Sequence, residues 1–213
     1  MAKNFKIQQP KMPHHLPELA FQLTEEDPYY SGALIKDCFI SAETANRLVF
    51  DQVTFKNVIF EEVSFSNIEL TDVIFDHCDL SNADFGAGII HRVEFQECKM
   101  LGINLSEATL GNVLFNGCHA NLSAFGFAKL KQVKFIECSL ENSDFYECTF
   151  QKLQFDKCAI NEANFANTPL KGIDLSNCIF EQLNVTWMDL KGCEVSSDQA
   201  IGFSRLLGLI IKE

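Results

Sequence analysis

The chain has 213 residues, 47% of them hydrophobic, and a formal net charge of −12, so a single domain with a sizeable core is expected. Such an excess of acid disfavours contact with nucleic acid and favours basic partners, and we expect no direct nucleic-acid binding. The sequence contains no secretory signal, lipidation motif or apolar run of 18 residues, which predicts a cytoplasmic protein without a membrane span.

Residues 1–32 lack any regular spacing of apolar residues and contain four of the five prolines, which break long elements and favour extended segments. The ends of repeat structures need covers, so we predict an N-terminal extension and cap over 1–32. The apolar residues suited to cover the first coil are Phe5, Ile7, Leu16, Leu19, Phe21 and Leu23.

From Leu48 to Val195 the apolar residues recur every five positions. Each step of five from Phe50 to Val195 reaches an apolar residue, and the position two before it is small or apolar, with Ser123, Ser143 and Thr168 as mild exceptions. A helix requires a spacing of 3.6 and a half-buried strand a spacing of 2, so neither fits. The pattern predicts a chain that turns a corner every five residues and winds as a solenoid.

The cysteines indicate the length of one coil. All nine occupy the small inward position, and a run of phenylalanines from Phe55 to Phe155 is spaced by 20 residues. We therefore expect four five-residue units per coil and a roughly square cross-section. Equivalent residues of successive coils should stack in ladders about 4.8 Å apart. Two thiols at that separation can form a disulfide. The same slot also holds Ala, Val and Ile, which favours buried free thiols, and an odd cysteine count agrees with a reducing compartment. Six cysteines share the 20-residue spacing: Cys78, Cys98, Cys118, Cys138, Cys158 and Cys178.

The repeat has one candidate interruption. Residues 33–40 carry the pattern, 41–46 lose it, and a loop or short helical turn is expected over 41–47 before the regular stack. Beyond about Phe55 the unbroken 20-residue spacing excludes a sizeable insertion. The predicted solenoid domain therefore spans 33–195.

After Val195 the pattern becomes helical. Ser197 and Asp198 are suited to begin a helix, which we expect to run to Leu207 and to stop at Gly208, followed by a strand-like segment over 209–211. The tail at 196–213 is either a simple lid over the last coil or a lid that also dimerises. Its candidate dimerisation residues are Ile201, Phe203, Leu206, Leu207, Leu209, Ile210 and Ile211.

The negative charge lies almost entirely on the repeat, where residues 48–195 contain 21 acidic and 10 basic residues. Seven acids and no Lys or Arg occur between Asn57 and His91, and a second acidic group surrounds Asp144. Lysines recur at about one coil length, and we expect them to stack on one corner, so that the rod has sides of opposite charge. These lysines are Lys131, Lys152, Lys171 and Lys191. The candidate partner-binding acids are Glu61, Glu62, Glu69, Asp72, Asp76, Asp79, Asp84, Glu141, Asp144 and Glu147.

Three units of the repeat closely match the A(D/N)Lxx motif of the pentapeptide-repeat family: Ala83-Asp84-Phe85, Ser143-Asp144-Phe145 and Ala163-Asn164-Phe165. The sequence resembles this family over most of its length, which implies an all-β fold, the right-handed quadrilateral β-helix, with a short C-terminal helix. In the Qnr-type quinolone-resistance branch a C-terminal helix forms a two-fold dimer interface. The resemblance therefore implies a homodimer through the C-terminal tail.

The same resemblance implies a function. A DNA-mimicking rod would bind a type II topoisomerase, DNA gyrase or topoisomerase IV, modulate or protect it, and reduce quinolone susceptibility. An acidic rod suits a basic DNA-binding groove. The alternative is a protein-interaction scaffold for another partner, which would use the outward Leu101, Leu122 and Phe127 or the lysines.

No arrangement of residues in the sequence suggests catalysis. The five His residues take unrelated positions, and the carboxylates lie on a convex rod without a dry pocket. Phosphate-binding, dinucleotide-binding and nucleophile motifs are absent, as are Cys and His spacings typical of zinc sites. We therefore expect a non-enzyme without a cofactor or a metal.

Overall fold

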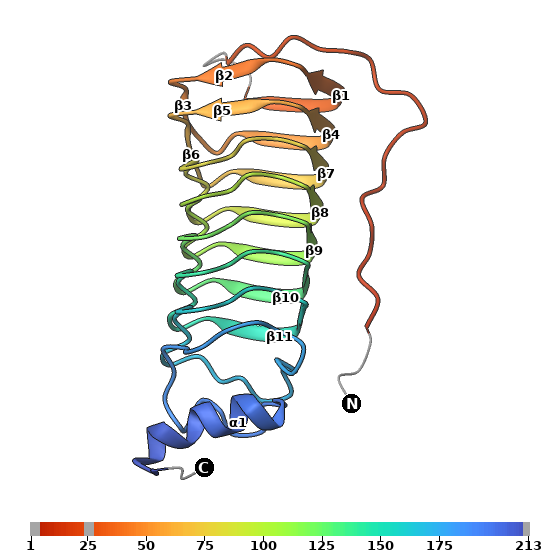
Figure 1. Cartoon of the computed structure of the whole chain (residues 1–213). Coiled ribbons are helices and arrows are strands. Elements are labelled where there is room, and N and C mark those ends of the chain that lie inside the picture. Colours follow the sequence, from red (N-terminus) through yellow and green to blue (C-terminus); the bar gives the residue numbers. More distant parts are fainter. Residues whose placement is uncertain (1–4, 24–27, 211–213) are drawn as a thin grey trace.

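The computed structural model describes residues 5–23 and 28–210, and the chain winds as a right-handed β-helix of stacked coils (Figure 1). Its largest sheet has seven parallel strands in the order β1, β4, β7, β8, β9, β10 and β11, one from each successive coil. Two short parallel sheets pair β2 with β5 and β3 with β6. The predicted all-β solenoid is confirmed. The strands of the large sheet are β1 Tyr29–Lys36, β4 Val49–Lys56, β7 Glu69–Asp76, β8 Ile89–Gln96, β9 Thr109–Asn116, β10 Lys129–Ile136 and β11 Thr149–Asp156. The short strands are β2 Phe39–Ser41, β3 Thr44–Asn46, β5 Ile59–Glu61 and β6 Ser64–Ser66.

The five-residue period of the sequence is the spacing of the corners. Every fifth residue from Asp37 to Asn167 has a positive φ, a sparsely allowed conformation that turns the backbone. One such corner, Gln52, lies inside β4, and its equivalents bend every later strand of the large sheet. That sheet therefore covers two of the four faces of each coil. We name the faces by their inward central residues, taken every 20 positions: face A from Phe50 to Leu190, face B from Phe55 to Leu175, face C from Ile40 to Phe180 and face D from Ala45 to Val185.

A ladder of phenylalanines fills the centre of face B. Successive rings from Phe55 to Phe155 stack with centroids 4.6–5.2 Å apart. The cysteines are free, as predicted, and Cys98 Sγ donates to the carbonyl of Phe75 at 3.5 Å. Burial raises the pKa of the Cys148 and Cys178 thiols to about 12, so these side chains remain protonated and act as small apolar residues.

The loop expected over 41–47 is wrong. Ser41 ends β2 and pairs with Glu61, and β3 places Ala45 opposite Phe65, 20 residues further on. Ala45 keeps the five-residue spacing between Ile40 and Phe50, but its small side chain gives a weak signal. The stack therefore has no interruption at 41–47.

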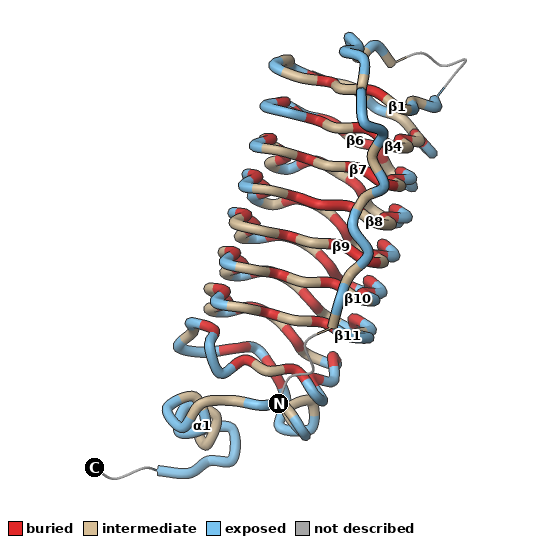
Figure 2. Tube along the Cα trace, turned by 90° about the vertical axis from the view of Figure 1, so that its right-hand side faces the viewer, coloured by how far each residue is buried: buried red, intermediate tan, exposed pale blue. Residues whose placement is uncertain are grey.

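The N-terminal extension does not simply cover the first coil. Residues 5–17, which we call the strap, run back along the outside of the stack from β1 toward β11 (Figures 1 and 2). The strap follows the corner between faces A and B, and side chains of that corner bond its backbone. These bonds are Lys11 N to Asp72 Oδ1 (2.9 Å), Gln8 N to Asn112 Oδ1 (3.0 Å), Gln52 Nε2 to Lys11 O (2.9 Å) and Gln132 Nε2 to Lys6 O (3.3 Å).

The segment after the strap takes the capping position that the sequence predicts. The amide of Leu19 donates to the carbonyl of Leu34 at 2.8 Å, and Phe21 and Leu23 pack against the core. The Phe21 ring lies 6.1 Å from that of Phe50. The predicted extension and cap is thus two structures, a cap at the first coil and a strap along the rod.

The C-terminal helix lies where the sequence predicts it. Helix α1 spans Ser197–Ser204 and continues as the 3₁₀ turn η1 over Arg205–Leu207. Ser196 caps it, since Ser196 Oγ accepts from Gln199 N (3.3 Å) and Gln199 Oε1 accepts from Ser196 N (2.9 Å). Residues 209 and 210 form no strand, and the predicted Ile211 lies outside the described residues. No helix within 5–23 and 28–210 has the length and apolar character needed to cross a membrane.

Candidate partner-binding face

Six of the ten acids named from the sequence lie on one side of the rod, on face D and at the corners and edge that border it. They are Glu61, Glu62, Asp84, Glu141, Asp144 and Glu147. The other four are scattered: Glu69 on face A, Asp72 at the corner under the strap, Asp76 on face B and Asp79 on face C. The two acidic clusters of the sequence therefore do not form one surface.

Three further acids complete this side, and sequence reasoning missed them. Glu107 shares a corner with Glu147, Glu162 shares one with Glu62, and Glu181 follows at the edge of face C. They lie outside the acidic clusters of the sequence, whereas sorting all acids by position within the 20-residue coil finds all three. We call these nine residues the acidic face: Glu61, Glu62, Asp84, Glu107, Glu141, Asp144, Glu147, Glu162 and Glu181.

The acidic face contains no positive charge. From Glu61 to Trp187, no Lys or Arg occupies an outward position of face D, of its two corners or of the adjoining edge of face C. The nine carboxylates extend over six steps of about 4.8 Å, or about 29 Å. This is about one carboxylate per 3 Å, close to the one phosphate per 3.4 Å of a single DNA strand.

Two of these acids also hold the fold. Asp84 Oδ1 accepts from the amide of Gly86 (3.0 Å) and from Asn104 Nδ2 (2.7 Å), while Oδ2 accepts from Ser64 Oγ (3.0 Å). Burial opposes ionisation of this carboxyl, but these hydrogen bonds hold the pKa of Asp84 below its usual value. Asp144 repeats the arrangement with the amide of Tyr146 and with Asn164. These hydrogen bonds fix both carboxylates in position.

Two other predicted acids are already paired. Asp72 is 4% exposed under the strap and forms a bidentate pair with Arg92, with Nε to Oδ1 at 2.5 Å and a second bond at 2.7 Å. Burial opposes its ionisation, but the bonds from Arg92 and Lys11 hold the pKa of Asp72 below its usual value. The expectation that Asp72 belongs to an open acidic surface is therefore wrong.

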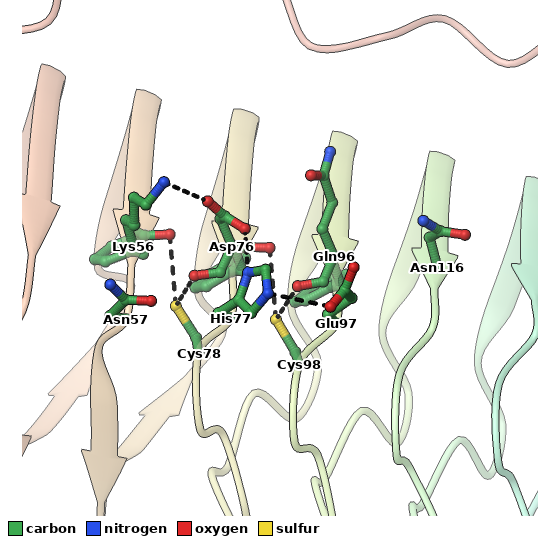
Figure 3. Close-up of polar contacts among 12 residues, drawn as sticks. Lys56, Asn57, Asp76, His77, Cys78, Gln96, Glu97, Cys98 and Asn116 are labelled. Atoms are coloured by element: carbon green, nitrogen blue, oxygen red, sulfur yellow. Dashed lines mark hydrogen bonds and ion pairs between the residues drawn. The ribbon is translucent and has the colours of Figure 1, made fainter.

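Asp76 belongs to a surface ion-pair cluster on face B. Its carboxylate contacts Lys56 Nζ (3.1 Å) and His77 Nδ1 (2.6 Å), and His77 Nε2 lies 3.1 Å from Glu97 (Figure 3). The hydrogen bond to Asp76, aided by Glu97, raises the pKa of His77. This cluster is locally neutralised and lies on the opposite side of the coil from face D.

An apolar belt crosses the middle of the acidic face. Leu122 and Phe127 occupy the two corners of one coil and are 60% and 52% exposed, and Leu101 lies one coil away. Phe127 contacts the ring of Tyr146 edge to face at 5.5 Å. The coil at 121–127 has no acid of its own, so the belt separates two acidic halves.

Most of the lysines that the sequence analysis expects to stack lie on another side, face A. Lys129 and Lys131 lie on face A in β10, and Lys171 and Lys191 follow on the same face. The predicted single stack is corrected in one place, because Lys131 pairs with Gln151 and Lys152 stands at the next corner. The expectation of unlike charges on different sides is confirmed by this arrangement.

The C-terminal tail presents an apolar surface. Trp187, Leu190, Phe203, Leu206 and Leu207 line a cavity of about 360 Å³ beside the last coil. Trp187 and Met188 also belong to this apolar surface, since both are more than half exposed. The sequence analysis did not include them among the candidate dimerisation residues. The predicted dimerisation residues Ile201, Leu206, Leu207, Leu209 and Ile210 are exposed, while Phe203 packs on Phe180 with centroids 5.7 Å apart.

Within the described part of the chain, no group of three or more His, Cys, Asp or Glu side chains could hold a metal ion.

Comparison with known proteins agrees with this architecture. The family described as "Pentapeptide repeat region" matches residues 68–137 and 128–200, and "Pentapeptide repeats (8 copies)" matches residues 49–86. Comparison with curated protein sequences gives no match.

Solved structures similar to this chain have low sequence identity to it. A trypsin-treated variant of QnrB1, described as a plasmid-mediated fluoroquinolone resistance protein, is 16% identical with a TM-score of 0.50, covering 84% of this chain and all of that one. HetL from Nostoc sp. strain PCC 7120, described as involved in heterocyst differentiation regulation, is 11% identical with a TM-score of 0.38, covering 79% of this chain and 90% of that one. Since the matched segments together span residues 49–200, the chain belongs to the pentapeptide-repeat family.

Proposed function

We propose that this protein is a non-enzymatic, DNA-mimicking binder of a type II topoisomerase, DNA gyrase or topoisomerase IV. Its acidic face occupies the basic DNA-binding surface of the enzyme, and this binding modulates or protects the enzyme and reduces quinolone susceptibility. The single observation that carries the proposal is the gathering of nine carboxylates on one side of a straight rod, in two halves beside the apolar belt, with no Lys or Arg among them.

Electrostatics support this choice of partner. A surface of one sign attracts the opposite sign over several ångströms and accelerates encounter with a basic groove. The spacing of the carboxylates approximates that of phosphates on one DNA strand. The fold that this chain shares with a QnrB1 structure is consistent with the proposal.

The experiment is a gyrase supercoiling assay with and without ciprofloxacin, in which the purified protein is titrated. We expect restored supercoiling in the drug, or inhibition without it. The triple charge reversal Glu107→Lys, Glu147→Lys, Glu162→Lys should weaken the effect about tenfold or more, since a loss of about 1.4 kcal/mol already corresponds to tenfold.

The matched control reverses the same number of charges elsewhere. This control is the triple variant Glu69→Lys, Glu97→Lys, Glu137→Lys. Glu69 lies on face A, and Glu97 and Glu137 lie at the corner between faces B and C. The variant therefore changes the net charge equally but leaves the acidic face intact. We expect this variant to behave as the parent. Equal losses in both variants would show that only net charge matters and would refute a specific binding face.

The apolar belt favours a second candidate, an interaction scaffold for a different protein. Exposed Leu122 and Phe127 are more typical of an anchor in a protein interface than of a DNA mimic. If the supercoiling assay shows no effect of the parent protein at low salt, the topoisomerase proposal fails. A scaffold would then be recognised by partner binding that resists salt and is lost on Phe127→Asp.

We also propose that the protein is a homodimer through its C-terminal tail. The exposed apolar residues of the tail and the adjacent Trp187 and Met188 form the surface that a second copy would cover. Replacing Leu207 and Ile210 by Asp should give monomers in sedimentation velocity at micromolar concentration, while the far-UV spectrum stays unchanged. An intact dimer in this variant would contradict the proposal.

A further inference from the structure

The solenoid opens at one place on its side. From β1 to β11 each coil of the large sheet pairs with the next, but within the described residues no backbone hydrogen bond joins 149–157 to 169–177. The ladder resumes one corner later, where Ile160 N donates to Ile179 O (3.0 Å) and Ile179 N to Cys158 O (2.9 Å). The lower edge of β11 is therefore an unpaired strand edge, visible in Figure 1 as the point where the arrows end.

The sequence provides a reason for the opening. In the preceding coils the residue that begins this face donates its amide to the coil before, as Thr149 does to Ala128 and Lys129 to Ala108. Pro169 occupies the same position in the next coil and has no amide hydrogen. Likewise, the amide of Glu137 donates to Asp156 O at 2.8 Å, whereas no such bond leaves the amide of Lys157, one coil further on.

The opening is a slot with polar groups that face it. A cavity of about 430 Å³ separates Lys152 and Gln154 of β11 from Lys171 and Asn177 of the following coil, a volume typical of ligand sites. The buried Oε1 of Gln154 has no hydrogen-bond partner, which is rare for a buried polar atom. Phe5 of the strap lies at the rim, beneath the ammonium of Lys134.

Two lysines and one acid line the slot, and Asn177 Nδ2 of the following coil donates to Asp156 Oδ1 of β11 at 2.5 Å. The two lysines are Lys152 and Lys171, and face A adds Lys129, Lys131 and Lys191 above and below. Asp174 is the one acid in its wall. An extended segment that carries carboxylates would therefore meet several lysines beside a free strand edge.

We propose that this slot binds an extended acidic segment of a partner protein by strand addition to β11. The partner backbone supplies the hydrogen bonds that the edge of β11 lacks, a donor of the partner meets Gln154 Oε1, and its carboxylates pair with Lys152 and Lys171. Main-chain bonds supply affinity and the lysines supply specificity. The slot lies at the corner between faces A and B, apart from the acidic face, so it constitutes a second binding site.

The first measurement is amide hydrogen exchange of the full chain. The amides of Phe150, Lys152, Phe155 and Lys157 should exchange at least about tenfold faster than their equivalents one coil before, Leu130, Gln132, Phe135 and Glu137, because unpaired amides open without a global transition. Equal protection in the two coils would show that the slot is closed in solution and would overturn the proposal.

The second measurement adds a probe peptide of alternating glutamate and valine, with its lysine and valine counterpart as the control. The acidic peptide should slow exchange at the β11 edge about tenfold, and Lys152→Glu with Lys171→Glu should abolish this protection. The variant Lys56→Glu with Lys99→Glu changes the charge equally in β4 and on face C, several coils away from the slot, and should retain it. Failure of the acidic peptide to protect the edge, or protection that survives in the slot variant, overturns the proposal.

Discussion

At the scale of single residues, the interior depends on how closely identical side chains stack. Phe135 lies between Phe115 at 4.6 Å and Phe155 at 5.2 Å, and it also meets Phe125 and Phe145 edge to face. It is fully buried, so its removal leaves a cavity that the rigid coils above and below cannot fill. Each rung thus supports two neighbours.

We expect Phe135→Ala to lower the free energy of unfolding by about 3–5 kcal/mol, the cost of lost burial plus a cavity. Denaturant unfolding followed by circular dichroism measures it. Phe127→Ala is the control, because that ring is half exposed and its loss should cost less than about 1 kcal/mol. Similar losses in both variants would contradict the inward and outward assignment.

Two histidines should titrate in opposite directions from the ordinary value of about 6.5. The bond to Asp76 raises the pKa of His77, while burial and the nearby Arg92 lower that of His91. Because the folded pKa of His77 exceeds the unfolded one, its stabilising effect is fully present below about pH 6.5 and is lost as the pH rises through the folded value. NMR titration should place His77 above His91, and Asp76→Asn should move the pKa of His77 down. The reverse order would refute the cluster as described.

At the scale of elements, the strap is the feature that sequence could not place. Its partners lie far along the chain, as Gln8 with Asn112 shows, and neither residue carries a signal for the other. The coil pattern was predictable because it repeats locally every five residues. The strand β3 was missed for the opposite reason, since Ala45 fits the repeat but is too small to stand out.

The pair beneath the strap gives a prediction at this scale. Arg92→Met leaves Asp72 buried without its partner, and we expect a loss of about 1–3 kcal/mol in the free energy of unfolding. Adding Asp72→Asn removes the uncompensated charge and should recover most of the loss. Thermal unfolding of both variants decides the matter, and an additive loss in the double variant would contradict a coupled pair.

At the scale of the whole molecule, charge is sorted by side. The sequence predicted sides of unlike sign, but six of its ten candidate acids lie on the acidic face and four elsewhere. Residues that are close in sequence lie on different faces of one coil, whereas residues separated by 20 positions lie on the same face of adjacent coils. Glu107 and Glu147 illustrate this, because they share a corner and are 40 residues apart. The charge of each side of such a rod, and so its binding, therefore depends on where the charged residues lie within the 20-residue coil.

The strap also changes how the rod unfolds. In a simple solenoid each coil contacts only its neighbours, so unfolding can begin at an end and spread coil by coil. Here one segment is bonded to corners as far apart as Gln52 and Gln132. Fraying of one end therefore also releases contacts far along the stack, and the strap makes the rod unfold more nearly as one cooperative unit.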